Sequence, residues 1–229
     1  MCPSSDLARS GDTLDQAAHA YHDMSDILPQ TEIAKAAYKH AAGLLAPSIL
    51  SHSIRVYLYA KALASHSASV YSTSPSKHDL LFTACLFHDI GTTEVYNGPS
   101  RFEIEGADAA STFLGGFSIS EADKHAVWAA IACHTSAGIA ERIGELSNFL
   151  RVAVLHDFGR KSKAWEVLEP LREGLEGRFE RAGIAKVLSD AVVQQAIKRP
   201  EKAPHGTWPG GMYRAYLANP EWEGVNKGF

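Results

Sequence analysis

An apolar stretch that ends in a histidine–aspartate pair, LLFTACLFHDIG at residues 80–91, constrains the fold more than any other part of the sequence. Eight mostly apolar residues lead into His88 and Asp89, and Gly91 follows where a left-handed helix cap would lie. Burying this stretch also buries the pair, which costs several kcal/mol unless something compensates both side chains. A divalent cation compensates an imidazole and a carboxylate together, so the pattern predicts a metal-binding helix end.

Two further polar residues lie on predicted buried helix faces. In the helix that Pro47 begins, apolar residues recur at steps of three and four and place His52 inward. Asp157 closes another apolar run, on the buried side of its helix. With His88 and Asp89 they offer two nitrogens and two carboxylates, which suit Zn²⁺, Fe²⁺ or Mn²⁺ better than Ca²⁺ or Mg²⁺. The alternative is a set of unrelated buried groups that the backbone satisfies, but it leaves unexplained why they end apolar runs.

Composition limits the class of protein. A chain of 229 residues with 45% hydrophobic content can bury a full core as one domain. The net charge of −4, without a basic stripe, argues against nucleic-acid binding. Three unpatterned cysteines argue against a disulfide framework, and no apolar run approaches the ~18 residues of a membrane span. We therefore expect a soluble, cytoplasmic protein with a small-molecule substrate and no membrane partner, and a homo-oligomer remains open.

Periodicity predicts an all-α fold. Residues 1–24 form a leader and a first helix, 25–199 a helical domain, and 200–229 a tail near the site with too much proline and glycine for regular structure. Residues 65–77 form a connector and 92–101 a loop that begins at the His-Asp pair. The predicted helices are Asp12–Met24, Thr31–Leu45, one from Pro47, about Lys77–Ile90, Phe102–Leu114, one from Ser120 to His134, one ending at Asp157, and two within Lys163–Lys198.

The order of His52, the His88-Asp89 pair and Asp157 resembles the metal-binding pattern of the HD-domain superfamily over residues 45–160. Four blocks are more similar to the fungal cyanamide hydratases and their relatives: LLAPSILSHSIRV at 44–56, TACLFHDIGT at 83–92, SRFEIEG at 100–106 and AAIACH at 129–134. The resemblance implies an HD domain at 25–199 that binds a metal ion, most simply zinc. A single ion is expected, because a histidine partner for His134 is missing near residues 105–110.

The resemblance also assigns roles to individual residues. It implies that His134 and Glu103 act in catalysis. Other positions are expected beside the substrate. The implied metal ligands are His52, His88, Asp89 and Asp157, and the implied substrate-binding residues are Phe102, Thr135, His205 and Trp208. The chain departs from the family at Thr135 and Phe158 and in the position of Trp208, so the substrate is less well defined than the metal site.

The activity implied is hydration of a small nitrile, such as cyanamide to urea, by a metal-dependent lyase. A metal with an open position lowers the pKa of bound water from about 15.7 to about 7. The alternative is an HD-type phosphohydrolase, for which Arg55 and Arg101 are the only nearby cations. Arg55 lies one turn after His52, where it could equally balance a carboxylate of the metal shell or pair at the surface. A binding module with a structural metal ranks third, because structural sites usually close with cysteine and histidine.

Overall fold

The computed structural model describes residues 21–221, which form an all-α fold without a strand, as predicted. The predicted helix Asp12–Met24 and the end of the chain beyond residue 221 lie largely outside the described residues. The helices are α2 (Glu32–Ala42), α3 (Pro47–His66), α4 (Val70–Thr73), α5 (Pro75–Phe87), α6 (Phe102–Gly115), α7 (Glu121–Cys133), α8 (Glu145–Asp157), α9 (Trp165–Leu168), α10 (Arg172–Arg178), α11 (Ile184–Lys198) and α12 (Trp208–Ala218).

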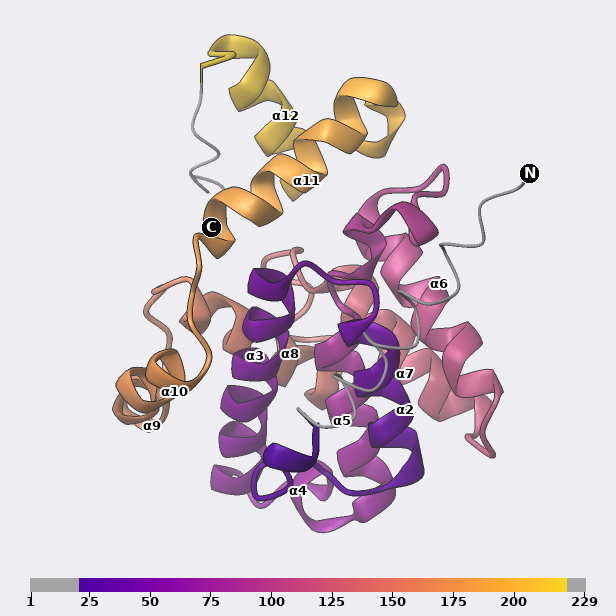
Figure 1. Ribbon diagram of the computed structural model, residues 1–229, viewed down its shortest axis with the longest axis vertical. Coiled ribbons are helices and arrows are strands. Elements are labelled where there is room, and N and C mark those ends of the chain that lie inside the picture. Colours follow the sequence, from indigo (N-terminus) through magenta and orange to yellow (C-terminus); the bar gives the residue numbers. More distant parts are fainter. Residues whose placement is uncertain (1–20, 222–229) are drawn as a thin grey trace, which may run out of the picture.

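Helix α5 lies at the centre of the fold. Every residue from 79 to 87 is buried, and the helix contacts α2, α3, α4, α6, α7 and α8. A helix that is apolar on all sides needs neighbours on all sides, which is why the run at 80–87 occupies this position. The helix lies among the helices at the centre of Figure 1, and the His-Asp pair that follows it is buried.

Local signals explain where the surrounding helices begin. The Thr31 hydroxyl accepts a hydrogen bond from the Ala34 amide at the start of α2, and Ser120 caps α7 through the Asp123 amide. Pro47 occupies the first turn of α3, where a missing N–H has no cost. Each of these starts was predicted from the sequence.

Gly91 does not cap a left-handed turn as the sequence suggested, because it is not among the residues with positive φ. It lies in the short 3₁₀ helix η1 (Ile90–Thr92), where a Cβ would lie 2.0 Å from the Phe102 carbonyl oxygen. The glycine is therefore required for close approach between the His-Asp segment and the start of α6.

Two segments predicted to be irregular are partly helical. The connector 65–77 contains α4 and the first turn of α5. The tail contains η4 (Pro200–Lys202) and the 11-residue helix α12, which Thr207 caps through the Gly210 amide. Pro209 lies in the first turn of α12, where proline is compatible with a helix, so composition alone was misleading there.

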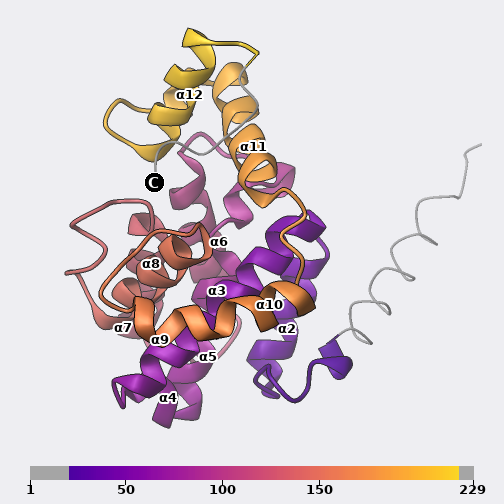
Figure 2. The ribbon, with the colours of Figure 1, turned by 90° about the vertical axis from the view of Figure 1, so that its left-hand side faces the viewer.

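The peripheral helices lie on two sides of the bundle. Helices α11 and α12 pack against each other and extend from one end of the bundle (Figure 1). Helices α9 and α10 lie across another face, where α9 contacts α3 (Figure 2). None of the helices in the described range is both long and apolar enough to cross a lipid bilayer.

Candidate metal centre

Three predicted ligands meet inside the bundle. His52 comes from α3, and His88 and Asp89 from the end of α5. The two Nε2 atoms are 3.2 Å apart, and they lie 3.6 Å (His52) and 3.2 Å (His88) from the Asp89 Oδ2 atom. All three residues are buried, and their candidate ligand atoms lie within 4.8 Å of one another.

Hydrogen bonds on the far side of each ring fix the tautomers of these histidines. The His88 Nδ1 atom is 2.7 Å from the Cys85 carbonyl oxygen, which can only accept, so Nδ1 carries the hydrogen. The His52 Nδ1 atom donates in the same way to an Asp157 carboxylate oxygen at 2.7 Å. Both Nε2 lone pairs therefore face Asp89, as ligand nitrogens do when their other nitrogen is held by a hydrogen bond.

His134 extends this cluster from the end of α7. Its Nδ1 atom donates to the Ile131 carbonyl oxygen at 2.7 Å, and its Nε2 atom lies 3.7 Å from the Asp89 Oδ1 atom. Its ring packs edge-on against His88, with a centroid distance of 5.1 Å. The structure thus places this predicted catalytic histidine beside the cluster, with its Nε2 lone pair also directed at Asp89.

The Asp89 carboxylate shows that the cluster fits a cation. It is buried, and neither oxygen has a hydrogen-bond partner in the described part of the chain. Two lone pairs 3.2 Å apart, as on His52 and His88, repel unless a proton or a cation lies between them. A divalent transition metal satisfies an unpaired carboxylate and imidazole nitrogens together, so the donor set fits such an ion.

The electrostatics of the cluster favour a charged Asp89 carboxylate and neutral His52 and His134 rings. Burial would raise the pKa of Asp89, but His88 and the other nearby histidines lower it to about 2. Burial lowers the pKa of His52 and brings that of His134 to about 3. Burial acts against protonation of His88 as well, but the neighbouring Asp89 charge raises its pKa.

Helix ends add negative potential at the same place. His88 is the C-cap of α5, His134 is the C-cap of α7, and Asp157 is the last residue of α8. The unpaired carbonyls of a last turn carry partial negative charge, so helices that end at a common point favour a cation there.

Asp157 lies in a different position from the one its predicted role as a ligand requires. Its two oxygens accept from the Arg55 Nε and Nη2 atoms at 2.7 and 2.8 Å, and one of them also accepts from His52 Nδ1. The residue is therefore behind His52, on the side of the ring away from Asp89, and it is absent from the ligand cluster. In this arrangement it orients a ligand through a hydrogen bond, as carboxylates next to metal-bound histidines do.

Arg55 is the residue whose role the sequence left open, and its location explains that of Asp157. It is fully buried, and its Nη1 atom also donates to the Phe179 and Glu180 carbonyl oxygens. The guanidinium thus holds Asp157 in a bidentate pair and the chain after α10 in place.

Glu103 and Thr135 form a second polar group near His134. The Thr135 hydroxyl donates to Glu103 Oε1 at 2.7 Å, whereas Oε2 has no hydrogen-bond partner among the described residues. Burial raises the pKa of Glu103 to about 7, against the opposing effects of Thr135 and Arg101. A carboxyl group with this pKa can both release and accept a proton near neutral pH.

The remaining predicted substrate-binding residues separate into two groups. Phe102 packs edge-on against His134 and against Trp208, with centroid distances of 5.6 and 5.8 Å. His205 is exposed and lies 3.2 Å from an Arg214 nitrogen, so the structure does not bring it to the cluster. Phe158, which the sequence did not assign to the site, packs on the His52 ring at 5.0 Å.

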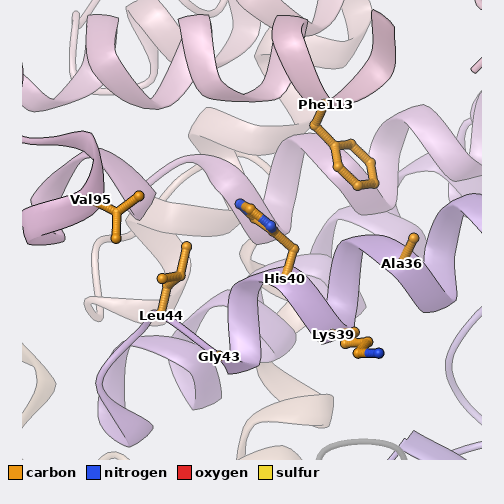
Figure 3. A pocket seen from close by; sticks show the side chains of 7 residues that line it. All are labelled: Ala36, Lys39, His40, Gly43, Leu44, Val95 and Phe113. Carbon is orange, nitrogen blue, oxygen red and sulfur yellow. The ribbon is translucent and has the colours of Figure 1, made fainter. Parts of the chain in front are cut away.

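An open surface pocket of about 460 Å³ lies between α2, Val95 and Phe113 of α6 (Figure 3). His40 projects into it and stacks on Phe87, which directly precedes His88, with a centroid distance of 5.4 Å. None of the predicted site residues lines this pocket.

The fold and the cluster together define an all-α protein with a candidate metal site. Residues 49–153 match the HD domain family, so the chain contains an HD domain. The match includes His52, His88 and Asp89 and ends before Asp157. No curated protein matches the sequence. HD domains are typically metal-dependent hydrolases, so the domain and the cluster indicate a metal-dependent enzyme of hydrolase type.

Proposed function

We propose that the protein is a hydratase that adds water to a small, uncharged nitrile-type substrate such as cyanamide, giving urea. The observation that carries this proposal is the pairing of the cluster with a buried carboxyl group, Glu103, whose raised pKa keeps a proton available near neutral pH. When bound by His52, His88 and Asp89, a divalent transition metal would lower the pKa of water at an open position to about 7.

The surrounding residues supply the proton transfers. His134 is unprotonated because burial lowers its pKa, so its Nε2 lone pair can accept a hydrogen bond that orients the attacking water, whose proton passes to solvent. As the water oxygen bonds to the nitrile carbon, the nitrogen gains a proton, for which Glu103 is the donor. A further proton shift converts the imidic acid into the amide, and the Glu103 carboxylate can carry that proton.

The phosphohydrolase alternative needs cations that can reach a phosphate. Arg55 is committed to Asp157 and to two backbone carbonyls, so it offers no free donor pair. Arg101 lies 3.9 Å from Glu103 and donates to the Ala132 carbonyl oxygen. A buried carboxyl group beside the site also disfavours a phosphate dianion, which supports the nitrile over the phosphate ester.

The test compares urea release from cyanamide with phosphate release from a nucleotide panel, using protein loaded in turn with Zn²⁺, Mn²⁺ or Fe²⁺. We expect the protein to form urea and Asp89→Ala to abolish this activity. Asp108→Ala is the control and should leave the activity intact, because Asp108 accepts a hydrogen bond from Trp128 away from the cluster. Phosphate release without urea would favour the phosphohydrolase. Retained metal with no turnover of either substrate would favour a structural metal site.

A further inference from the structure

The chain between the His-Asp pair and α6, residues 91–101, is held at two carbonyl oxygens by the C-terminal part of the protein. The Gln195 Nε2 atom donates to the Gly91 carbonyl oxygen at 2.9 Å. The Gly98 carbonyl oxygen accepts from Lys202 Nζ at 2.7 Å and from Arg199 Nη1 at 2.9 Å. Gln195 lies in α11, Lys202 in η4 and Arg199 between them, all about one hundred residues further along the chain.

Lys202 is an unusual residue for this task. It is only 2% exposed, and no carboxylate lies within ion-pair distance of it in the described part of the chain. Burial lowers the pKa of its ammonium group, since desolvation disfavours the charge. The Lys202 ammonium therefore makes a strong, charge-assisted hydrogen bond to residues 91–101 at one point, the Gly98 carbonyl oxygen.

Residues 91–101 begin and end beside the candidate site. Gly91 packs directly on the Phe102 backbone, so the segment returns to its starting point. Asp89 lies two residues before this contact, and Glu103 lies just after it. Trp208, from α12, packs edge-on against Phe102. The segments that carry Asp89 and Glu103 thus meet where Gly91 contacts Phe102. Gln195 holds the Gly91 carbonyl oxygen at this contact.

We propose that Gln195 and Lys202 are positioning residues, which fix residues 91–101 and so keep Asp89 and Glu103 in a constant relative position. The inference rests on the proposed function for its effect on turnover. The restraint itself can be measured without any substrate, because it concerns the backbone of residues 91–101.

The first measurement is amide hydrogen exchange of residues 91–101 in the full-length protein. Lys202→Met and Gln195→Leu should raise exchange in this segment about 10-fold to 100-fold, as expected for the loss of a buried hydrogen bond. The matched controls are Lys186→Met and Gln194→Leu, which alter exposed residues of α11. Arg199→Gln is a milder variant that removes one of the two donors to Gly98, and it keeps the test available should Lys202→Met fail to fold.

The second measurement separates binding from chemistry. With cyanamide as substrate, Lys202→Met and Gln195→Leu should lower kcat about 10-fold with little change in KM, and Lys202→Arg should restore much of the loss by keeping a cationic donor. Unchanged exchange in both variants would overturn the restraint. Raised exchange with an unchanged kcat would overturn its role in positioning. Absence of turnover in the unaltered protein would instead refute the proposed function, and the exchange result would still decide the restraint.

Discussion

Replacing Arg55 by methionine should be among the most destabilising single changes in this protein. The guanidinium is fully buried and makes two bonds to Asp157 and two to the carbonyl oxygens of Phe179 and Glu180. Methionine has a similar length and leaves little cavity, so the change removes charge and hydrogen bonds rather than volume. It leaves a fully buried carboxylate whose remaining partners are His52 and, at 3.7 Å, Arg181.

The expected loss follows from this geometry. Removing one member of a buried ion pair lowers the free energy of unfolding by roughly 3–5 kcal/mol, because the other charge stays buried without compensation. For a chain of this size, each 1 kcal/mol lowers the melting temperature by roughly 2–4 °C, so a decrease of about 6–20 °C is expected. The pKa of Asp157, which its partners hold well below the usual range, should rise in the variant.

Urea denaturation monitored by circular dichroism provides the assay, with a double-mutant cycle as its internal check. Arg178→Met is the matched control, because Arg178 pairs with Asp26 at the exposed surface and should contribute less than about 1 kcal/mol. The double variant of Arg55→Met with Asp157→Leu removes both charges and should be more stable than Arg55→Met alone.

Two results would refute this reasoning. If Arg55→Met lost less than about 1 kcal/mol, the buried pair would not be a major source of stability. If the double variant lost the sum of the two single losses, Arg55 and Asp157 would not interact, and the placement of Asp157 behind His52 would be in doubt.

Three further predictions concern the candidate site. His88→Ala or Asp89→Ala should abolish binding of Zn²⁺, measured by elemental analysis after dialysis, because each removes a donor of the buried cluster. Asp157→Asn should weaken Zn²⁺ binding by only about 10–100-fold in calorimetry, as expected for a residue that orients a ligand; complete loss would show that Asp157 is itself a ligand. If Glu103 acts as an acid, kcat should fall as pH rises through about 7, where burial has placed its pKa. Glu103→Gln should lower kcat and remove this decrease from the pH profile. An unchanged decrease in the variant would exclude Glu103 as its source.

The sequence predicted the helices around the site because their apolar patterns reflect burial directly. The run at 80–87 is buried along its whole length, and His52 and Asp157 lie on buried faces, as periodicity implied. Periodicity specifies which face of a helix is buried but not which residue lies opposite. The partner of Asp157 is Arg55, 102 residues earlier, and no local pattern identifies such a pair.

The conformation of the tail and the role of Gly91 depend on position rather than composition. Pro209 lies in the first turn of α12, so a segment rich in proline and glycine could still contain a helix. Gly91 is needed because the Phe102 backbone lies against it, a tertiary contact that a helix-cap rule does not consider. Predicting either feature would require knowing which residues, distant in the sequence, lie against it.

The two histidines that end α5 and α7 show how a helical bundle can prepare a metal site. Each C-cap histidine turns its Nδ1 atom back to the carbonyl oxygen three residues earlier, Cys85 for His88 and Ile131 for His134. One bond therefore satisfies a carbonyl of the last turn and directs the Nε2 lone pair away from the helix, toward Asp89. Helix termination and ligand orientation are thus achieved by the same contact, which explains why both histidines directly follow apolar helical runs.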